Sequence, residues 1–295
     1  MNTNEMNAQE SYQKHALHLQ ERVKSAQFWE ERSVNDWRAE RLYGALDPII
    51  QSDKSASWLT VGDGYGADAH YLLKSGVIEV LASDIEDSIL SLAKASGRIK
   101  QYAALNAEAI DLEDNAYDFV LCKEALHHFP RPYLALSEMT RVAKRAVIFM
   151  EPVDIALSNP AFLLLKNLGD RLPKLFGGLW KNRYSFETVG NYVYKFSKRE
   201  VEKFAMGMGL RHIAFGGIND VHDDSPEMNE RPMNQRKLRQ IQKRIKLKDR
   251  LCATDFIPKM HLIAVIGKGT FSDEFKDVLN KSHFQIQDLP LNPYA

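Results

Sequence analysis

Residues 59–68 read LTVGDGYGAD, and this stretch decides the fold. Trp58 to Val61 is a short apolar run with β-branched side chains, which predicts a buried strand. Gly62, Gly64 and Gly66 follow, and the sequence from Ala67 onward has a helical pattern. Because glycine lacks a Cβ, such a turn can adopt unusual dihedral angles and leave room for a ligand, while the first N–H groups of the helix point toward that ligand. We therefore predict a strand, a ligand-binding turn and a helix in succession.

Two other interpretations of the glycine turn remain open at this point. The turn can be a tight connection that binds nothing. Gly62, Gly64 and Ala67 also satisfy the fingerprint G-x-G-x-x-G/A, which is typical of nicotinamide dinucleotide-binding domains. The residues that follow decide between these interpretations.

After the turn, strand and helix patterns alternate with short links as far as Pro152. Such alternation predicts a parallel sheet with helices on both faces. We expect strands at 77–82, 99–103, 117–122 and 145–150, and helices at 67–74, 87–95 and 132–143.

Asp84 stands just past the second predicted strand, about 20 positions beyond the glycines, where a ribose-binding carboxylate is expected. A carboxylate there can accept hydrogen bonds from both ribose hydroxyls, and Ile85 can pack on an adenine ring. The alternative is that Asp84 caps the helix at 87–95, since Asp is favoured at N-caps.

Composition excludes several classes of protein. The chain of 295 residues carries 39 basic and 39 acidic side chains, so no general electrostatic attraction to nucleic acid is expected. Its two cysteines, Cys122 and Cys252, form neither a disulfide framework nor a metal-type spacing, which is typical of a reducing cytoplasm. The polar start lacks the apolar core of a signal peptide, and no apolar run is long enough to span a membrane. We expect a cytoplasmic protein without a metal site.

The string from Tyr117 to Pro152 is more specific than the glycines. It runs from YDFV at 117–120 into LHHF at 126–129, continues through EMTRV at 138–142 and ends at Glu151-Pro152. Together with the glycine turn, Asp84 and NAE at 106–108, it resembles the class I S-adenosylmethionine (SAM) methyltransferases, in the type 11 group that includes the ubiquinone and menaquinone methyltransferases. The resemblance covers roughly residues 57–152. It implies an α/β, Rossmann-like sheet of seven strands, mostly parallel with the last strand antiparallel and helices on both faces, in which 210–215 and 261–266 are the final strands.

The resemblance also implies how SAM is held as the cofactor. The backbone of the glycine turn would face the methionine part of SAM, and Asp84 would bind the ribose beside an adenine packed on Ile85. Ala107 and Glu108 would meet the adenine edge, and the backbone at Lys123 would line the methionine end. The expected cofactor-binding residues are therefore Gly62, Asp63, Gly64, Gly66, Asp84, Ile85, Ala107, Glu108 and Lys123.

One position departs from the family pattern. The family usually has an acidic residue two positions before the first glycine, where this chain has Thr60. Asp63, inside the turn, is expected to take over part of that role. The departure also leaves open a different class of function, a SAM-sensing or partner-binding module without turnover.

Two histidines follow the fourth predicted strand, whose end faces the transferred methyl group in this fold. Methyl transfer requires donor and acceptor to be held in line away from water, and an oxygen nucleophile usually needs a base. Histidine suits that task because its pKa lies near neutrality. Phosphoethanolamine methyltransferases, which have a similar pattern, place a histidine in this stretch. The comparison makes His128 the first candidate for the base, ahead of His127, with Glu124 as a substrate contact; a capping or packing role is the alternative for both histidines.

The remaining segments are organised around this core. We expect an N-terminal helical cap at 1–50, the SAM-binding core at 51–152, a helical lid or substrate insertion at 153–196, the rest of the core at 197–269 and a tail at 270–295. The apolar stretch at 161–180 within the lid can instead be a closed helical hairpin or a membrane-surface helix. Arg183 and Tyr184 follow it and, with Glu151, are candidate substrate contacts.

A basic insertion at about 219–258 interrupts the second part of the core. Leu238, Ile241 and Ile245 recur there at helical spacing, which predicts an amphipathic helix. Its cationic side chains form either a solvated outer face or a patch for an anionic substrate.

These patterns favour methyl transfer to a hydroxyl, and less readily to an amine, of a small molecule. The second half of the chain is similar to methyltransferases of surface-polysaccharide biosynthesis, so a sugar or an anionic nucleotide-sugar is the more detailed expectation. The alternatives are C-methylation of a quinone or lipid, with weak membrane-surface contact, and the non-catalytic module. A homo-oligomer is compatible with the sequence, and nucleic acid is not an expected partner.

Overall fold

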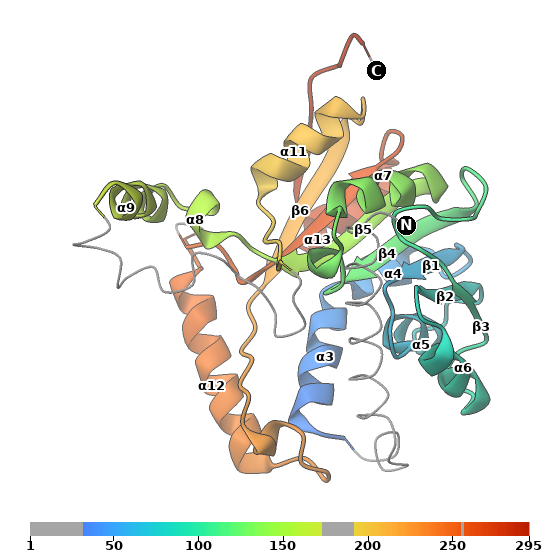
Figure 1. The fold of residues 1–295 in the computed structure, drawn as a ribbon, viewed down its shortest axis with the longest axis horizontal. Coiled ribbons are helices and arrows are strands. Elements are labelled where there is room, and N and C mark those ends of the chain that lie inside the picture. The colour runs from blue at the N-terminus through green and yellow to red at the C-terminus, as the bar shows by residue number, and fades with distance from the viewer. Residues whose placement is uncertain (1–31, 173–191, 255–256, 295) are drawn as a thin grey trace, which may run out of the picture.

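The computed structural model describes residues 32–172, 192–254 and 257–294. Its centre is an eight-stranded sheet with the order β3-β2-β1-β4-β5-β7-β6-β8 (Figure 1). β1 to β5 are mutually parallel, whereas β7 runs antiparallel to both β5 and β6, and β8 runs antiparallel to β6. The strands are β1 (Trp58–Val61), β2 (Val80–Asp84), β3 (Gln101–Ala104), β4 (Tyr117–Lys123), β5 (Ala143–Pro152), β6 (His212–Ile218), β7 (His261–Gly267) and β8 (Gln285–Asp288). The Rossmann-like α/β architecture predicted from the sequence is confirmed.

Helices cover both faces of this sheet. Buried side chains of α4 (Asp47–Ser52), α5 (Ala67–Lys74), α6 (Ser88–Ala95) and α13 (Asp273–Lys281) belong to one core cluster, and those of α7 (Pro132–Val142) and α11 (Lys198–Gly207) belong to the other. The remaining described helices are α3 (Val34–Gly44), α8 (Ile155–Ser158), α9 (Pro160–Arg171), α12 (Gln235–Leu251) and the 3-10 turns η1 (Leu126–His128) and η3 (Pro226–Met228).

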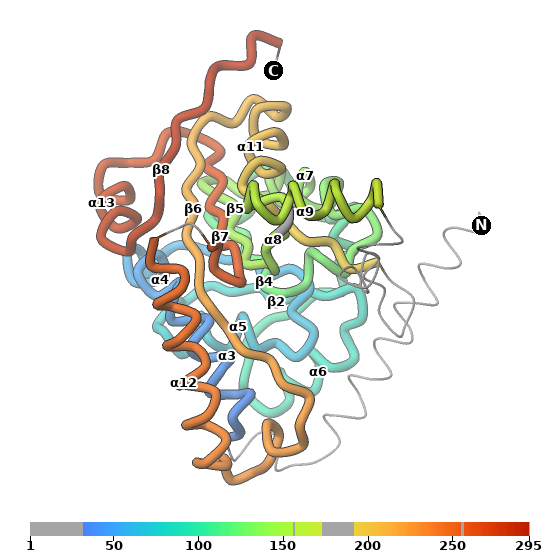
Figure 2. Tube along the Cα trace, turned by 90° about the vertical axis from the view of Figure 1, so that its left-hand side faces the viewer, coloured from blue at the N-terminus to red at the C-terminus, as the bar shows by residue number. Residues whose placement is uncertain are grey.

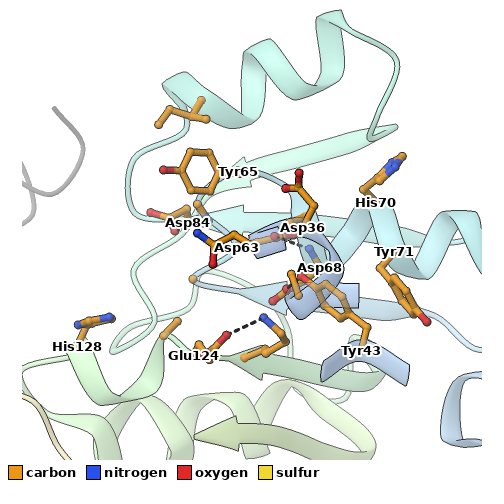
Figure 3. Close-up of a pocket in the computed structure, with 18 of the residues that line it drawn as sticks. Asp36, Tyr43, Asp63, Tyr65, Asp68, His70, Tyr71, Asp84, Glu124 and His128 are labelled. Carbon is orange, nitrogen blue, oxygen red and sulfur yellow. Dashed lines mark hydrogen bonds and ion pairs between the residues drawn. The ribbon is translucent and has the colours of Figure 1, made fainter. Parts of the chain in front are cut away.

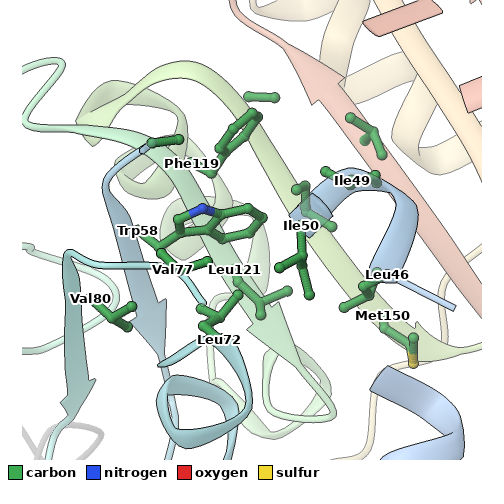
Figure 4. Close-up of a cluster of buried hydrophobic side chains, with 14 of the residues drawn as sticks. Leu46, Ile49, Ile50, Trp58, Leu72, Val77, Val80, Phe119, Leu121 and Met150 are labelled. Carbon is green, nitrogen blue, oxygen red and sulfur yellow. The ribbon is translucent and has the colours of Figure 1, made fainter. Parts of the chain in front are cut away.

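The first core cluster is built on aromatic side chains of the central strands. The rings of Trp58 on β1 and Phe119 on β4 lie 4.7 Å apart, and Ile49 and Ile50 of α4 pack beside them (Figure 4). Burying one such aliphatic or aromatic side chain stabilises the fold by roughly 1.5–3 kcal/mol. This packing fixes the amino-terminal segment to the sheet and so positions α3, which precedes α4, at the edge where the parallel strands end.

The second strand begins later than the sequence suggests, at Val80 rather than residue 77. Gly76, with φ +97°, ends α5, the Gly76 N–H donates to the Leu73 carbonyl, and the Val77 N–H donates to the Leu72 carbonyl. This is the Schellman arrangement, in which the residue after the glycine makes an apolar contact with the last turn of the helix. Val77 is therefore buried as part of the helix end, not as the start of a strand.

The tail predicted at 270–295 is an ordered part of the core. α13 buries Phe275 and Leu279, Phe284 is buried as well, and β8 adds an eighth strand at the sheet edge. The seven-strand count from the sequence was therefore one strand short. The polar composition of the tail concealed an amphipathic helix whose apolar side chains are few but are all directed to one face.

Helices α12 and α9 lie outside the two main core clusters. α12 packs on α3 through a third cluster of Val34, Val221, Met228, Ile241 and Ile245. α9 stands away from the sheet and buries none of its residues. Nowhere in the described ranges does a helix combine the length and the apolar character needed to cross a membrane. The candidate substrate residues Arg183 and Tyr184, and residues 1–31 of the predicted cap, lie outside the described residues.

Candidate active site

A cavity of about 1040 Å³ opens at the carboxyl ends of β1, β2 and β4. The glycine turn, the ends of β2 and β4, and η1 form one side of the cavity, and α3 with part of the basic insertion forms the other. Figure 3 shows Asp84 and Tyr65 on one side of the turn, and Glu124 and Tyr43 on the other. In an open α/β sheet, this edge is where ligands bind.

The glycine turn has the backbone that its sequence predicts. Gly62, Gly64 and Gly66 all have positive φ angles, of +72°, +38° and +69°. A Cβ at Gly62 would lie 2.6 Å from the Cβ of Ala125. Glycine at this position therefore leaves room for the Ala125 side chain as well as for a ligand. The Gly64 N–H donates to the Asp84 carboxylate at 2.9 Å, which ties the turn to the end of β2.

Asp63 acts as the cap of α5. Its carboxylate accepts hydrogen bonds from the backbone N–H groups of Asp68 (2.8 Å) and Ala69 (2.9 Å), and from the Thr60 hydroxyl (2.8 Å). Gly66, at the N-cap position, has no side chain to do this. Asp63, inside the turn, is thus the acid nearest to the expected position two residues before the first glycine. Thr60 occupies that position and donates a hydrogen bond to Asp63.

Asp68 is a second buried carboxylate of the cavity, and it accepts a hydrogen bond from the Tyr43 hydroxyl of α3. Burial, and then the proximity of Asp68, raise the pKa of Asp63 well above its ordinary value. Burial likewise raises the pKa of Asp68, although the nearby Lys123 ammonium opposes that rise. Two buried acids that resist ionisation are suited to a cationic ligand, because a bound cation compensates their charge.

Glu124 holds a charged network at the end of β4. It adopts a left-handed φ of +51°, which is uncommon for a residue other than glycine and is found preferentially at functional sites. Its carboxylate lies 3.2 Å from the Lys123 ammonium, 3.2 Å from His261 Nε2 and 3.6 Å from the Arg38 guanidinium. Burial alone would raise the pKa of Glu124, but Lys123, His261 and Arg38 together hold that pKa well below its ordinary value. Glu124 is therefore an anion that fixes the side chains of Lys123, Arg38 and His261 around it.

His127 is held by a buried carboxylate. Its Nδ1 atom lies 2.5 Å from Glu151 Oε2, while Glu151 Oε1 accepts from the N–H groups of Ala125 (3.0 Å) and Leu126 (2.8 Å). Glu151 is fully buried and is not among the residues that line the cavity, so the prediction that it contacts substrate is not supported by its position. His127 and His128 both line the cavity, with their ring centroids 3.8 Å apart.

The remaining predicted cofactor residues divide into two groups. Ile85, Ala107 and Lys123 line the cavity together with Asp84, as expected. Glu108 does not line it, because its carboxylate accepts hydrogen bonds from the backbone and side chain of Arg131, at 2.7 and 2.8 Å. Asp84 does not cap α6; Asp87 occupies that position.

The sequence predicted a helical cap at 1–50 but named none of its residues as part of the site, although α3, which lies within that range, forms a wall of the cavity. Tyr43, Arg38 and Asp36 of α3 line the cavity, as do His222 and Arg231 of the basic insertion. The described parts of the predicted lid, residues 153–172 and 192–196, do not line the cavity. Of the site residues that were not predicted, Asp68 could have been found from the sequence, because it is an acid at the second position of the helix that follows the glycines. No motif marks Tyr43.

The cavity fits SAM in the chemistry of its lining. Asp63 and Asp68 are buried acids whose charge a cationic methionine end would compensate, and Asp84 lines the cavity at the end of β2, where the ribose-binding carboxylate was expected. Ile85, Ile89, Leu105, Ala107 and Phe129 supply apolar surface for an adenine ring. In the part of the chain that the structure describes, no three His, Cys, Asp or Glu side chains gather as metal ligands would.

The fold and this cavity define the class of protein, a class I methyltransferase. Residues 59–150 match the protein family described as a methyltransferase domain, so this segment is a methyltransferase domain, the chain is a SAM-dependent methyltransferase, and SAM is its cofactor. No curated protein sequence matches the chain.

Several solved structures are similar to this one. A SAM-dependent methyltransferase of Archaeoglobus fulgidus is 14% identical, with 78% of this chain and 94% of that chain covered at a TM-score of 0.48. A SAM-dependent methyltransferase of Methanosarcina mazei is also 14% identical, with 75% and 97% covered at a TM-score of 0.47. The magnesium protoporphyrin IX methyltransferase of Synechocystis PCC 6803, with bound SAH, is 13% identical, with 90% and 88% covered at a TM-score of 0.44.

Proposed function

We propose that this enzyme methylates a hydroxyl group of a small, polar acceptor, with His127 as the general base. The observation that carries the proposal is the hydrogen bond between His127 Nδ1 and the buried Glu151. Bound SAM supplies an electrophilic methyl group on its sulfonium. A hydroxyl is a weak nucleophile, so a positioned base that removes its proton accelerates the reaction by about 10²–10⁴-fold.

The partner of Nδ1 decides the protonation of the imidazole ring. Glu151 uses Oε1 for two backbone N–H groups and faces the ring with Oε2, so Nδ1 is favoured as the protonated nitrogen. The basic nitrogen of neutral His127 is then Nε2. His128 also lines the cavity and is the second candidate, because the proposal is built on the observed contact between His127 and Glu151.

The wall opposite the glycine turn supports a hydroxyl-bearing acceptor. It carries Asn35, Asp36, Asn229 and Arg231. The Oδ1 atom of Asn35 is buried with no hydrogen-bond partner in the described structure, while its amide donates to Asn229 at 2.8 Å. A buried acceptor atom of this kind favours a ligand that donates hydrogen bonds.

The cations of this wall are largely neutralised by the chain. The Arg231 guanidinium lies 2.6 Å from the Asp36 carboxylate, and Arg38 is paired with Asp220 and Glu124. The wall therefore favours an uncharged, polyhydroxylated group such as a sugar, whether or not the acceptor also carries a nucleotide or phosphate elsewhere. A quinone, whose carbonyl oxygens only accept hydrogen bonds, would leave the buried Oδ1 atom of Asn35 without a donor.

The test is transfer of a labelled methyl group from SAM into a panel of sugars, nucleotide-sugars, amines and quinones. Label in a sugar hydroxyl supports the proposal. Label on a quinone ring carbon would replace it with C-methylation. SAM binding without transfer to any acceptor class would favour a SAM-binding module.

A further inference from the structure

Helix α12 carries a stripe of cations that the fold does not use. Five basic side chains form this stripe: Arg236, Arg239, Lys243, Lys246 and Arg250. At 3.6 residues per turn they fall within about 80° of one another, and at a rise of 1.5 Å per residue they extend over roughly 21 Å. All five are exposed, and none has an ion-pair partner within the described ranges. We call them the basic stripe.

The cations on the flanks of α12 are different. Lys237 pairs with Asp223 at 2.9 Å, Arg244 pairs with the same carboxylate at 3.3 Å, and Lys248 donates to the Asp220 carbonyl at 3.0 Å. These contacts hold the helix to the insertion. The stripe is therefore an additional accumulation of charge, in a chain whose net charge is zero.

The basic stripe faces away from the body of the protein. Ile241 and Ile245, on the opposite side of α12, are buried against Val34 of α3. Figure 1 shows α12 outside α3, at the edge of the molecule, and Figure 2 shows α12 in front of α3. A partner that approaches this side meets the cations first.

Apolar side chains accompany the cations on this side. Leu247 and Leu251 lie next to the stripe on α12 and are more than half exposed, at 58% and 54%. α9 lies on the same side of the molecule, toward the viewer in Figure 2, and exposes Phe162, Leu164, Leu165 and Leu168. Neither set belongs to the cavity.

We propose that this side of the protein, with the basic stripe of α12 and the apolar side chains of α9, binds an anionic membrane surface. A basic helix flanked by exposed aliphatic residues has both properties that interfacial binding needs, attraction to anionic headgroups and insertion of apolar groups. A nucleic acid would satisfy the cations but would leave the exposed leucines and Phe162 in water. The proposal does not depend on which acceptor the enzyme methylates.

Binding of the full-length protein to two kinds of vesicle tests the proposal. One kind is pure phosphatidylcholine, and the other contains equal amounts of phosphatidylcholine and phosphatidylglycerol. We expect sedimentation with the anionic vesicles, little with the neutral ones, and weaker binding as salt is raised. Each basic residue near an anionic surface strengthens binding roughly fivefold, so Arg239→Gln/Lys243→Gln/Lys246→Gln should bind about 100-fold more weakly.

Matched variants identify which face of the protein binds the vesicles. Lys54→Gln/Lys100→Gln/Lys144→Gln removes three exposed lysines at the amino-terminal edge of the parallel strands, and we expect it to bind as the unmodified protein does. Leu164→Gln/Leu165→Gln should weaken vesicle binding about tenfold or more, because two apolar side chains would no longer leave water on insertion. Circular dichroism confirms that the variants are folded.

Three outcomes would overturn the proposal. They are absence of binding to anionic vesicles, equal losses for the two charge variants, and binding to poly(U) that is as tight as binding to vesicles and insensitive to the leucine changes. The last outcome would assign the stripe to nucleic acid.

Discussion

The Nδ1 atom of His127 lies 2.5 Å from the Oε2 atom of Glu151, and the two residues come from the ends of the adjacent parallel strands β4 and β5. The contact joins η1, the turn that follows β4, to the buried carboxylate of Glu151 near the end of β5. It places an oriented imidazole at the edge of the sheet where the cofactor cavity opens.

Replacement of His127 by alanine should lower kcat by about 10²–10⁴-fold, because the hydroxyl would then lose its proton without a base. The dissociation constant of SAM, measured by calorimetry, should change little. Glu151→Gln should also lower kcat, since the amide can present its N–H to the ring and favour the wrong tautomer. His128→Ala is the matched comparison, and a larger loss for His128→Ala than for His127→Ala would transfer the role of base to His128.

Asp84→Ala should weaken SAM binding by about 1–3 kcal/mol, the scale of a hydrogen bond to a charged group. Part of this loss would come from the turn, because the Asp84 carboxylate also accepts from the Gly64 N–H. Asp84→Asn separates the two effects: its amide oxygen can still accept from Gly64, but the negative charge is gone. Calorimetry with SAM measures both variants, and unchanged affinity in Asp84→Ala would contradict the ribose assignment.

The sequence predicted the parts of the fold that local pattern controls. Alternating strands and helices, the glycine turn and the helix that begins at Pro132 all depend on residues close to one another in the chain. The amphipathic helix at 235–251 is also visible in the spacing of Ile241 and Ile245. These features were confirmed, with strand ends displaced by a few residues.

The tertiary contacts could not be predicted in the same way. Tyr43 reaches Asp68 across 25 positions, and Arg38 reaches Asp220 across 182, so neither pairing leaves a local signal. Glu151, at the end of β5, was predicted as a candidate substrate contact. Whether a strand-end carboxylate points into the cavity or behind it depends on the neighbouring turn, here Ala125 to His127.

Asp63→Ala should lower the free energy of unfolding by about 1–2 kcal/mol, because α5 would lose the carboxylate that caps two of its N–H groups. Thr60→Val, which removes one donor to that carboxylate, should cost about 1 kcal/mol. Since the two residues share a hydrogen bond, the double variant should lose less than the sum. Denaturant unfolding measures all three, with Asp111→Ala as an exposed control expected to stay within about 0.5 kcal/mol. Additive losses would contradict the coupling.

SAM binding should release protons and should strengthen as pH rises from the acidic range. Burial raises the pKa values of both Asp63 and Asp68, and the nearby Asp68 adds to the rise at Asp63, so the empty cavity retains protons above the ordinary carboxyl range. A bound cation favours the ionised carboxylates and expels those protons. For the same reason, the protein without ligand should lose stability as pH rises from the ordinary carboxyl pKa toward the raised values, because the folded state binds more protons than the unfolded state.

Calorimetry in buffers with different ionisation enthalpies measures the number of protons released when SAM binds. Asp68→Asn should reduce that number, because it removes one of the two acids and also the repulsion that raises the pKa of Asp63. Asp36→Asn is the control: Asp36 lines the same cavity but is paired with Arg231, so its removal should leave the proton release unchanged. If affinity is flat across this pH range and the heat of binding does not depend on the buffer, the two acids do not receive the cationic end of the cofactor.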